Sequence, residues 1–531
     1  MTFCTLPDVV RPQTLSIRIS YQNMPESREA LRVRFDEPAG RWVVLATVLG
    51  SGLAMLDATV VNVALERIGA DLGADLAALQ WTLSGYSLTL ASFILLGGSL
   101  GDRFGRRRVF VIGTAWFATA SALCGLAPNV STLVAARALQ GIGGALLTPG
   151  SLAIISASFT PEDRPRAIGA WSGLGGVAGA IGPFVGGWLV DAWSWRLVFL
   201  VNLPVAAVVI GVALRHVPES RDPDAGHRLD VPGAVLGALG LAGLTYASIA
   251  AGKEGGSPAV VATGAVGVLA LVAFMLVERK SPEPLVPPGL FASRQFTVAN
   301  LFTFTIYAAL GAVFFLLVLA LQLVAGYSPL AAGLSMVPVT AVMLALSSRS
   351  GAIAQHIGPK LQLTVGPLIA AAGLLLALRI GAGASYLTVV LPAVILFSLG
   401  LAVLVAPLTA TVLAAAPGAH VGVGSAVNNA VARTGGLLAV ALLPALAGLA
   451  GDDYRRPDAF AAGYRLAMLV NVGLLALGAL LAAVGISNEV PQAAPAGGLV
   501  PEERKLTHYY SCPIDGPRLE TIQPVREGGH A

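Results

Sequence analysis

The sequence predicts an all-α integral membrane protein with fourteen spans, arranged along the chain as six, then two, then six. Two observations support this prediction. Hydrophobic residues make up 55% of the 531-residue chain and charged residues only 12%, whereas a soluble domain carries about 25% charged residues. Apolar runs of about 20 residues, the length that a helix needs to cross a bilayer, recur along the chain. The bilayer is therefore the expected solvent and partner.

The apolar runs form three series that are separated by charged, Pro-rich or Gly-rich breaks. An N-terminal six-helix bundle is expected over residues 42–215, with runs near 42–65, 81–101, 108–127, 131–158, 166–190 and 196–215. Two additional central spans with flanking loops are expected over residues 216–296, near 231–251 and 258–277. A C-terminal six-helix bundle is expected over residues 297–486, with runs near 297–324, 330–350, 361–380, 386–412, 423–449 and 463–486.

Lys and Arg residues indicate the orientation, because cytoplasmic loops are enriched in them. One set of alternate loops holds fourteen of these residues and the other set holds seven. We therefore expect a multi-pass protein of the cell membrane with both termini in the cytoplasm. Residues 1–41 and 487–531 are expected to be cytoplasmic tails, and the second, rich in Pro, Gly and charge, is expected to be disordered. Met24 is an alternative start.

A short internal repeat supports two related bundles. Residues 98–107 join the second and third spans, and residues 351–360 join the equivalent spans of the second bundle. Both glycines and a basic residue recur in register, while Asp102 is replaced by Gln355. Two parallel repeats predict a substrate site between the bundles, near the middle of the bilayer.

Ionisable residues deep in the spans are functional candidates, because a charge at a helix centre costs about 2.5–3.5 kcal/mol on insertion scales. Three qualify: Asp57, Arg137 and Arg433. Burial raises the pKa of a carboxyl and a nearby arginine lowers it, so Asp57 is a candidate proton carrier with Arg137. The alternative is a fixed ion pair that joins spans 1 and 4. Arg433 has either a packing role or a role in substrate or conformational coupling.

Two further segments are expected to control conformation. The charged loop after span 2 either sets topology or forms ion pairs that stabilise one state. Span 5 contains three Gly-x-x-x-Gly steps, which suit close helix contact, and a proline that favours a kink. We expect a hinge or a tight seal there, with simple packing as the alternative. The gating candidates are Gly98, Asp102, Arg103, Gly105, Arg106, Arg107, Gly182, Pro183, Gly186 and Gly187.

Several of these segments resemble motifs of the major facilitator superfamily. Residues 98–107 resemble its motif between spans 2 and 3, residues 137–141 resemble its span-4 motif, and Gly169 with residues 182–187 resembles the span-5 motif of its antiporters. Residues 56–65 resemble the first-span signature of its fourteen-span drug:proton antiporter branch. Ala178 stands where the span-5 motif has a glycine.

The resemblance implies proton-coupled export of small lipophilic drugs by alternating access, with the small-molecule substrate and protons as partners. Residues 330–350 contain no Asp or Glu, so neutral or monocationic substrates are expected. We expect a monomer without a cofactor. The residues expected to face a substrate cavity are Asn62, Trp81, Tyr86, Gln140, Tyr307, Gln322, Asn429 and Arg433.

Other classes of function fit the sequence less well. The chain has no G-x-x-x-x-G-K-[ST] phosphate loop, and its six histidines lie in loops, span edges or tails. Neither an enzyme nor a metal site is therefore expected. A nucleic-acid-binding protein would need a basic stripe on a folded domain, which the sequence lacks. The remaining alternative is a proton-coupled importer or uniporter of a small metabolite.

Overall fold

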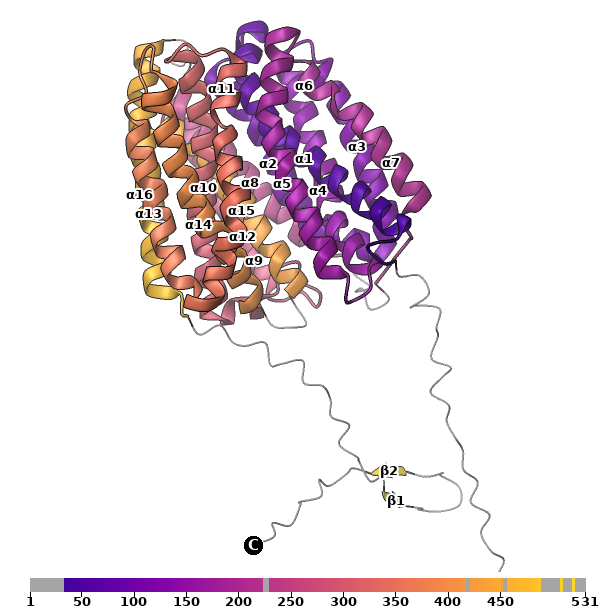
Figure 1. Cartoon of the computed structure of the whole chain (residues 1–531). Helices are drawn as coiled ribbons and strands as arrows, with labels where there is room; N and C mark the ends of the chain where they lie inside the picture. The colour runs from indigo at the N-terminus through magenta and orange to yellow at the C-terminus, as the bar shows by residue number, and fades with distance from the viewer. Residues whose placement is uncertain are drawn as a thin grey trace, which may run out of the picture.

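The computed structural model describes residues 33–222, 229–416, 421–449, 451, 456–488, 507–509 and 518–520. Long helices dominate these residues, and they form two side-by-side groups of roughly parallel helices (Figure 1). Thirteen helical segments are long and apolar enough to cross a membrane. The predicted all-α membrane fold is confirmed. The count of fourteen membrane spans remains a prediction, because α5 (Arg164–Ala192) is not among the thirteen segments.

The first bundle is built from the N-terminal third of the chain. Its other helices are α1 (Pro38–Leu72), α2 (Leu76–Phe104), α3 (Arg106–Gly125), α4 (Val130–Ser158), α6 (Leu197–Leu200) and α7 (Asn202–His216). Helix α4 packs against α2 and α3, while α1 packs against α5 and α7. The side chains of Asp75 and Asn129 accept hydrogen bonds from backbone N–H groups in the first turns of α2 and α4, which fixes where these helices begin.

The second bundle follows the same plan. Its helices are α10 (Arg294–Leu323), α11 (Pro329–Ser335), α12 (Val337–Ile357), α13 (Pro359–Ala377), α14 (Leu391–Ala415), α15 (Val421–Leu446) and α16 (Pro457–Gly485). Two short helices, η2 (Pro288–Ala292) and η3 (Tyr386–Val390), precede α10 and α14. Two predicted spans are interrupted, at Val201 between α6 and α7 and at Met336 between α11 and α12.

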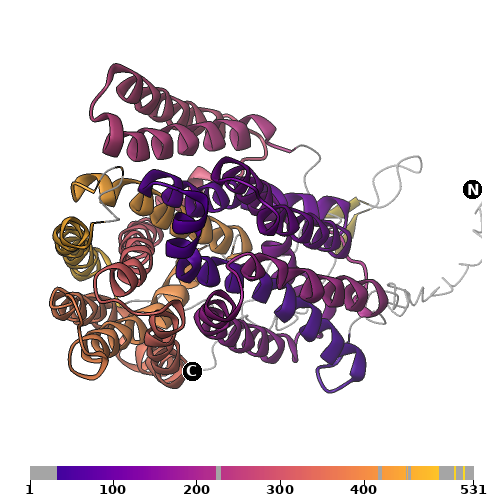
Figure 2. The ribbon, with the colours of Figure 1, turned by 90° about the horizontal axis from the view of Figure 1, so that it is seen from above.

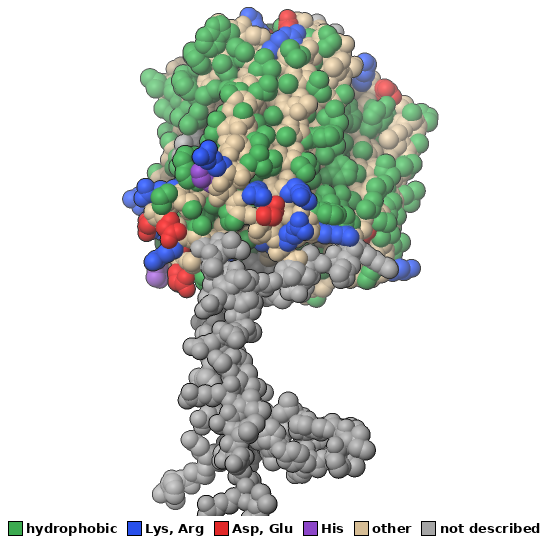
Figure 3. Space-filling model, turned by 90° about the vertical axis from the view of Figure 1, so that its right-hand side faces the viewer, with side chains coloured by type: hydrophobic (Ala, Val, Ile, Leu, Met, Phe, Trp, Pro, Cys, Tyr) green, Lys and Arg blue, Asp and Glu red, His purple; other side chains and the backbone are tan. Residues whose placement is uncertain are grey.

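Helices α8 (Val231–Glu254) and α9 (Pro258–Glu278) form a hairpin that is central in the sequence but peripheral in space. Seen from above, this hairpin lies outside both bundles (Figure 2). Helix α8 contacts α2 of the first bundle and α15 of the second. Hydrophobic side chains cover most of the face drawn in Figure 3, and charged side chains gather in a band near one end. This pattern suits a bilayer with an aqueous boundary.

The internal repeat has matching geometry in the two bundles. Gly105 links α2 to α3 at φ +115°, and Gly358 links α12 to α13 at φ +80°. Both values are in the region that favours glycine. Glu219 lies against Gly105 and accepts hydrogen bonds from the N–H groups of Arg107 and Arg108 at 3.1 and 3.2 Å. Asn488 lies against Gly358 and accepts one from the N–H of Lys360 at 3.1 Å.

The hydrogen bonds that join the two bundles lie at the end opposite the α2–α3 link. Gln322 of α10 donates to the carbonyl of Val63 at 3.0 Å. Gln80 of α2 donates to the carbonyls of Val440 and Ala441 at 2.8 and 3.0 Å. Among the described residues, no hydrogen bond or ion pair joins the bundles at the α2–α3 end. Among the described residues, the hydrogen bonds between the bundles are therefore confined to one end, which we call the closed end.

A third connection at the closed end involves α5 and α11. Asp191, near the end of α5, accepts hydrogen bonds from the Ser328 hydroxyl and the Leu330 N–H, both at 2.9 Å. Ser328 also caps the first turn of α11. The N-terminus of α11 thus lies directly against a carboxylate of the first bundle, an arrangement that favours the negative charge.

Most of the two predicted tails lies outside the described residues, as does Met24. Within the C-terminal segment, β1 (Thr507–Tyr509) and β2 (Arg518–Glu520) pair antiparallel, with Thr507 opposite Glu520. In the N-terminal segment, Val33 forms an isolated bridge with Phe159, next to the start of α1.

Candidate functional site

Asp57 and Arg137 form a buried ion pair in the first bundle. Asp57 lies in the middle of α1 with 0% of its surface exposed, and Arg137 lies in α4 with 1% exposed. The guanidinium of Arg137 donates to Asp57 Oδ2. Since α1 and α4 pack against each other, this contact joins two spans across the core of the bundle.

Polar side chains from α4 and α7 hold the second oxygen of the carboxylate. Gln140 donates to Asp57 Oδ1 at 2.9 Å and to the Ser121 hydroxyl at 3.1 Å. Asn202 donates to the same two groups, at 3.3 and 3.0 Å. Gln140 Oε1 accepts from Arg137 at 2.7 Å. The carboxylate is thus oriented by three donors in a dry environment, where electrostatic interactions are strong.

Arg137 also has contacts that do not depend on Asp57. Its Nε donates to the Thr82 carbonyl at 3.0 Å. Its guanidinium carbon lies 4.4 Å from the centroid of the Tyr86 ring and 5.7 Å from that of Phe199, which are favourable cation–π distances. If Asp57 took up a proton, these contacts would keep Arg137 in the bundle while the charge attraction was lost.

Glycine on the face of α4 lets α2 come close to this site. A Cβ at Gly141 would overlap the Thr89 hydroxyl and the Tyr86 carbonyl, and a Cβ at Gly144 would lie 3.2 Å from the Tyr86 hydroxyl. Thr89 donates to the Ala138 carbonyl at 2.7 Å across the same contact. This glycine face of α4 next to Arg137 is therefore in close contact with α2.

Arg433 occupies a different environment from Arg137. It lies half-buried in α15, one turn after the exposed Asn429. No hydrogen bond or ion pair joins it to another described residue. It interacts electrostatically with the hydroxyls of Tyr86 in the first bundle and Tyr307 in the second. The Tyr86 hydroxyl is buried without a hydrogen-bond partner. Arg433 therefore lies near tyrosines of both bundles.

The other cavity candidates lie elsewhere. Asn62 is half-buried and donates to the Ala58 carbonyl of its own helix at 2.9 Å. Trp81 packs against Tyr246 of α8, with ring centroids 6.4 Å apart. Gln322 is buried in the closed end, bound to Val63. Gln140 belongs to the Asp57 cluster. Asn429 is exposed on α15, and Arg433, one turn later, lies near Tyr86 and Tyr307.

The glycines of α5 divide into two groups. A Cβ at Gly182 would overlap the Thr59 hydroxyl, and one at Gly186 would lie 3.0 Å from Val60, so both pack against α1. Gly187 and Pro183 face α11, where a Cβ at Gly187 would lie 2.6 Å from the Cα of Leu330 and the Pro183 carbonyl lies against Gly333. Pro183 and Gly187 thus lie in the interface between the bundles, whereas Gly182 and Gly186 lie in the contact between α5 and α1 of the first bundle.

The first half of α5 has open space instead. A Cβ at Gly169, Gly173 or Gly179 would meet no atom within 4 Å. Gly175 differs from them, because its Cβ would lie 3.6 Å from the Met55 sulfur, an ordinary contact. Close helix contact is therefore not formed at Gly169, Gly173 or Gly179. These glycines are free to form such a contact in a state that closes at the α2–α3 end.

The α2–α3 link is held within the first bundle. Asp102 pairs with Arg106 at 2.8 Å, and Arg107 donates to the Val217 carbonyl at 3.0 Å and lies 3.7 Å from Glu219. Arg103 is exposed, with its guanidinium 5.3 Å from the Phe104 ring centroid. A Cβ at Gly98 would meet only Pro149, at 3.7 Å. The link is rigid but makes no described hydrogen bond or ion pair to the second bundle.

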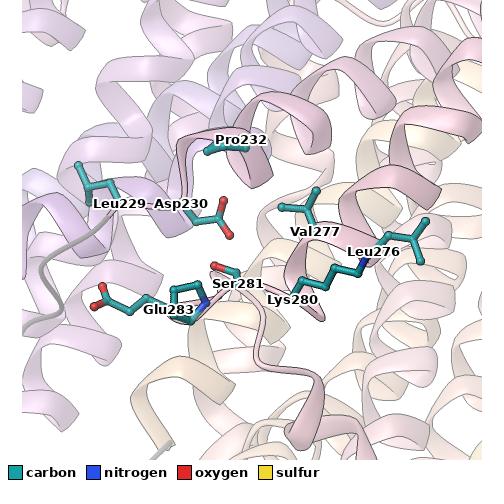
Figure 4. Close-up of a pocket in the computed structure, with 9 residues that line it drawn as sticks. Leu229, Asp230, Pro232, Leu276, Val277, Lys280, Ser281 and Glu283 are labelled. Carbon is teal, nitrogen blue, oxygen red and sulfur yellow. The ribbon is translucent and has the colours of Figure 1, made fainter.

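The Asp57 cluster coincides neither with a candidate metal site among the described residues nor with the cavity at the end of the α8–α9 hairpin. Among the described residues, no group of three His, Cys, Asp or Glu side chains could hold a metal ion. A cavity of about 370 Å³ lies between the ends of α8 and α9, lined by residues that include Asp230, Lys280 and Glu283 (Figure 4). It is remote from Asp57 in the peripheral hairpin.

Sequence reasoning missed Ser121 and Glu219, and it did not place Asn202 or Thr82 at the site. Ser, Thr and Asn are common in spans as local hydrogen-bonding residues, so nothing in the sequence distinguishes Ser121 from its neighbours. The signal that could have found Glu219 is its position: it follows the end of a span, as Asn488 does in the second bundle.

Comparisons with known proteins agree with this architecture. Residues 47–440 match the Major Facilitator Superfamily. A puromycin resistance protein of Streptomyces alboniger is 38% identical over 478 residues, which cover 86% of this chain and 93% of the relative. A tetracenomycin C resistance and export protein of Streptomyces glaucescens is 35% identical, over 79% of this chain and 78% of the relative. A D-xylose-proton symporter shares the fold, with TM-score 0.60 and 17% identity over 84% of this chain and 98% of the symporter.

Proposed function

Because the chain belongs to the Major Facilitator Superfamily, we propose that it exports small lipophilic drugs across the cell membrane in exchange for protons. The names of both relatives, a puromycin resistance protein and a tetracenomycin C resistance and export protein, support export. The family and these relatives are transporters, which argues against an enzyme.

The observation that carries the proposal is the burial of Asp57 against Arg137. An ion pair removed from water is favourable only while both partners are charged and hydrogen-bonded. Protonation of Asp57 would leave Gln140 and Asn202 in place but cancel the attraction that joins α1 to α4. A proton would thus weaken one specific contact between spans. This is the change that a proton-driven switch requires.

The bundle interface supports alternating access. The predicted orientation puts the α2–α3 link in the cytoplasm, so the closed end at Gln80, Asp191 and Gln322 would face the outside. The structure then represents an inward-facing state. In the alternate state, these hydrogen bonds break and the first half of α5, with its open Gly169 and Gly173, closes against the second bundle.

The substrate would bind between the bundles, near Arg433 and Asn429 of α15 and Tyr86 of α2. Tyr86 touches Arg137 with its ring and interacts with Arg433 through its hydroxyl. A substrate that moves Tyr86 would therefore affect the proton site directly. We propose that the protein works as a monomer, because each chain contains both bundles and the complete Asp57 cluster.

The competing function is import of a small metabolite with protons. The D-xylose-proton symporter shows that the same fold supports it, but at 17% identity this likeness concerns the fold alone. The direction of transport is therefore decided by experiment.

Wild type, Asp57→Asn and Asp36→Asn are expressed at matched levels in a pump-deficient bacterium, and ethidium efflux and puromycin resistance are measured with and without a protonophore.

Asp36→Asn is the matched control, because Asp36 also pairs with an arginine but is 73% exposed. The proposal predicts protonophore-sensitive efflux or resistance in the wild type and in Asp36→Asn, and its loss in Asp57→Asn. Uptake of either compound that the wild type increases would support the importer. Export that the protonophore does not affect would overturn proton coupling.

A further inference from the structure

The α8–α9 hairpin contains two buried carboxylates that the transport mechanism does not use. Asp230, just before α8, is 8% exposed, and Glu278, at the end of α9, is 2% exposed. A Cβ at Gly233 would lie 2.6 Å from Glu278 Oε1 and 2.9 Å from Asp230 Oδ1. The two carboxylates therefore converge on the same glycine and lie close to each other.

Each carboxylate uses one oxygen for the local backbone and leaves the other without a partner. Asp230 Oδ1 accepts from the Gly233 N–H at 2.7 Å, and Glu278 Oε2 accepts from the Val286 N–H at 2.9 Å. The remaining oxygens, Asp230 Oδ2 and Glu278 Oε1, are buried without a hydrogen-bond partner. Buried unpaired charge is costly, so this pair calls for a cation that can donate hydrogen bonds.

Asp230 lines the cavity of about 370 Å³ between α8 and α9, a volume in the range of small-molecule sites. Figure 4 shows its carboxylate pointing from α8 toward Val277 and Ser281 of the α9 side. Lys280 extends toward Leu276 instead, and no ion pair joins it to Asp230 or Glu278. The protein's own lysine thus leaves the carboxylates available and adds a positive charge to the rim.

An apolar surface continues from this cavity along α9. A second cavity, of about 390 Å³, is lined by Val268, Leu271, Val272, Met275, Leu276 and Arg279. Leu276 belongs to both cavities. Val268, Val272 and Met275 are about half exposed, as expected for side chains that face acyl chains. Arg279 ends this surface beside Lys280.

The site lies at the end of the hairpin that shares its side with the α2–α3 link. At the other end of α8, Lys253 lies 3.6 Å from Asp75, at the start of α2. Asp230 is therefore at the membrane boundary at which charged side chains begin, with the apolar face of α9 below it. A ligand that fits this site would carry a positive group for the carboxylates, a negative group for Lys280 and Arg279, and apolar chains for the face of α9.

We propose that this site binds phosphatidylethanolamine. The primary ammonium would donate hydrogen bonds to Asp230, with Glu278 adding negative charge behind it. The phosphate would lie between Lys280 and Arg279, and the acyl chains would follow α9. A trimethylammonium group has no N–H to donate, so phosphatidylcholine satisfies the phosphate and the apolar surface but not the unpaired carboxylate oxygen.

Lipid retention by the purified full chain tests this proposal. Native mass spectrometry measures binding of phosphatidylethanolamine, its mono- and dimethyl derivatives and phosphatidylcholine, all with the same acyl chains. We expect one tightly retained lipid, with retention falling stepwise as N–H groups are removed and at least fivefold lower for phosphatidylcholine. Equal retention of all four lipids would overturn the proposal.

Two substitutions test the charge of the carboxylates while keeping their hydrogen bonds to the backbone. Asp230→Asn and Glu278→Gln each keep an oxygen for the backbone hydrogen bond and remove the charge, so both should abolish or reduce the preference for phosphatidylethanolamine. Glu254→Gln, at the other end of α8, should keep it. Lys280→Gln should weaken the binding of all four lipids to the same extent. A preference for phosphatidylethanolamine that survives in both carboxylate variants would contradict a lipid ammonium site. So would a preference that 1 mM Mg²⁺ abolishes, because the metal ion would then occupy the site.

Discussion

Glu219 and Asn488 occupy equivalent positions in the two bundles. Glu219 lies three residues after His216, the end of α7, and Asn488 lies three residues after Gly485, the end of α16. Each side chain accepts a hydrogen bond from the start of the third span of its bundle, at Arg107 and at Lys360. The two halves of the chain thus fix the same helix start in the same way, although a carboxylate does it in one and an amide in the other.

The first prediction concerns the glycine that Glu219 covers. Gly105→Ala should lower the unfolding temperature in detergent, because a side chain at φ +115° is strained by about 1–3 kcal/mol and would displace Glu219. Gly98→Ala is the control, since its Cβ would meet only Pro149 at 3.7 Å. Equal unfolding temperatures for the two variants would show that the Gly105 geometry contributes no stability.

The second prediction concerns the two ends of α5. Gly187→Val should disfavour the closed end, because its side chain would collide with Leu330, whereas Gly173→Val has open space in this state. A single cysteine at Asn429 in a cysteine-free background reports access from the α2–α3 end through maleimide labelling in inside-out vesicles. Labelling should fall in Gly187→Val and stay the same or rise in Gly173→Val. The reverse order would contradict the assigned state.

The third prediction separates a transport role of Arg433 from a packing role. Arg433 has no described hydrogen-bond or ion-pair partner, and a charge in a span costs about 2.5–3.5 kcal/mol on insertion scales. Arg433→Gln should therefore leave the unfolding temperature unchanged or raise it while lowering efflux about tenfold or more. Loss of thermal stability in parallel with loss of efflux would assign Arg433 to packing.

The fourth prediction concerns the Asp57–Arg137 pair. Asp57→Ala or Arg137→Ala alone should destabilise the protein by about 3–5 kcal/mol, because each leaves an uncompensated buried group. The double variant Asp57→Ala/Arg137→Ala should lose less stability than the sum of the two single variants, because it leaves neither charge unpaired, and this double-mutant cycle measures the difference. Additive losses would show that the two side chains do not stabilise each other.

The sequence was sufficient for most of the fold because the bilayer imposes a simple rule. A helix that crosses it needs a long apolar run, so α1 to α4 and α10 to α16 fall where such runs are. The Asp57–Arg137 pair could also be expected, because very few ionisable residues lie deep in the spans. Because so few charged residues lie in the spans, each of them has few possible ion-pair partners.

The rest depended on which way each helix faces. Gln322 and Trp81 are polar or aromatic residues in spans, as cavity residues are, but one closes the bundle interface and the other packs on α8. Ser121 and Asn202 belong to the Asp57 cluster only because α3 and α7 turn them inward. The glycines of α5 look alike in sequence, yet Gly182, Gly186 and Gly187 have close neighbours and Gly169, Gly173 and Gly179 have none within 4 Å.

Proton coupling through Asp57 is tested most directly in proteoliposomes that contain the purified protein and a transported dye. Two rates are compared: dye exchange at equal pH on both sides, and dye accumulation driven by an imposed pH gradient. Asp57→Asn should keep exchange, because Gln140 and Asn202 still bind the side chain, and should lose the response to the pH gradient. Gradient-driven accumulation that persists in Asp57→Asn would contradict the central role of Asp57.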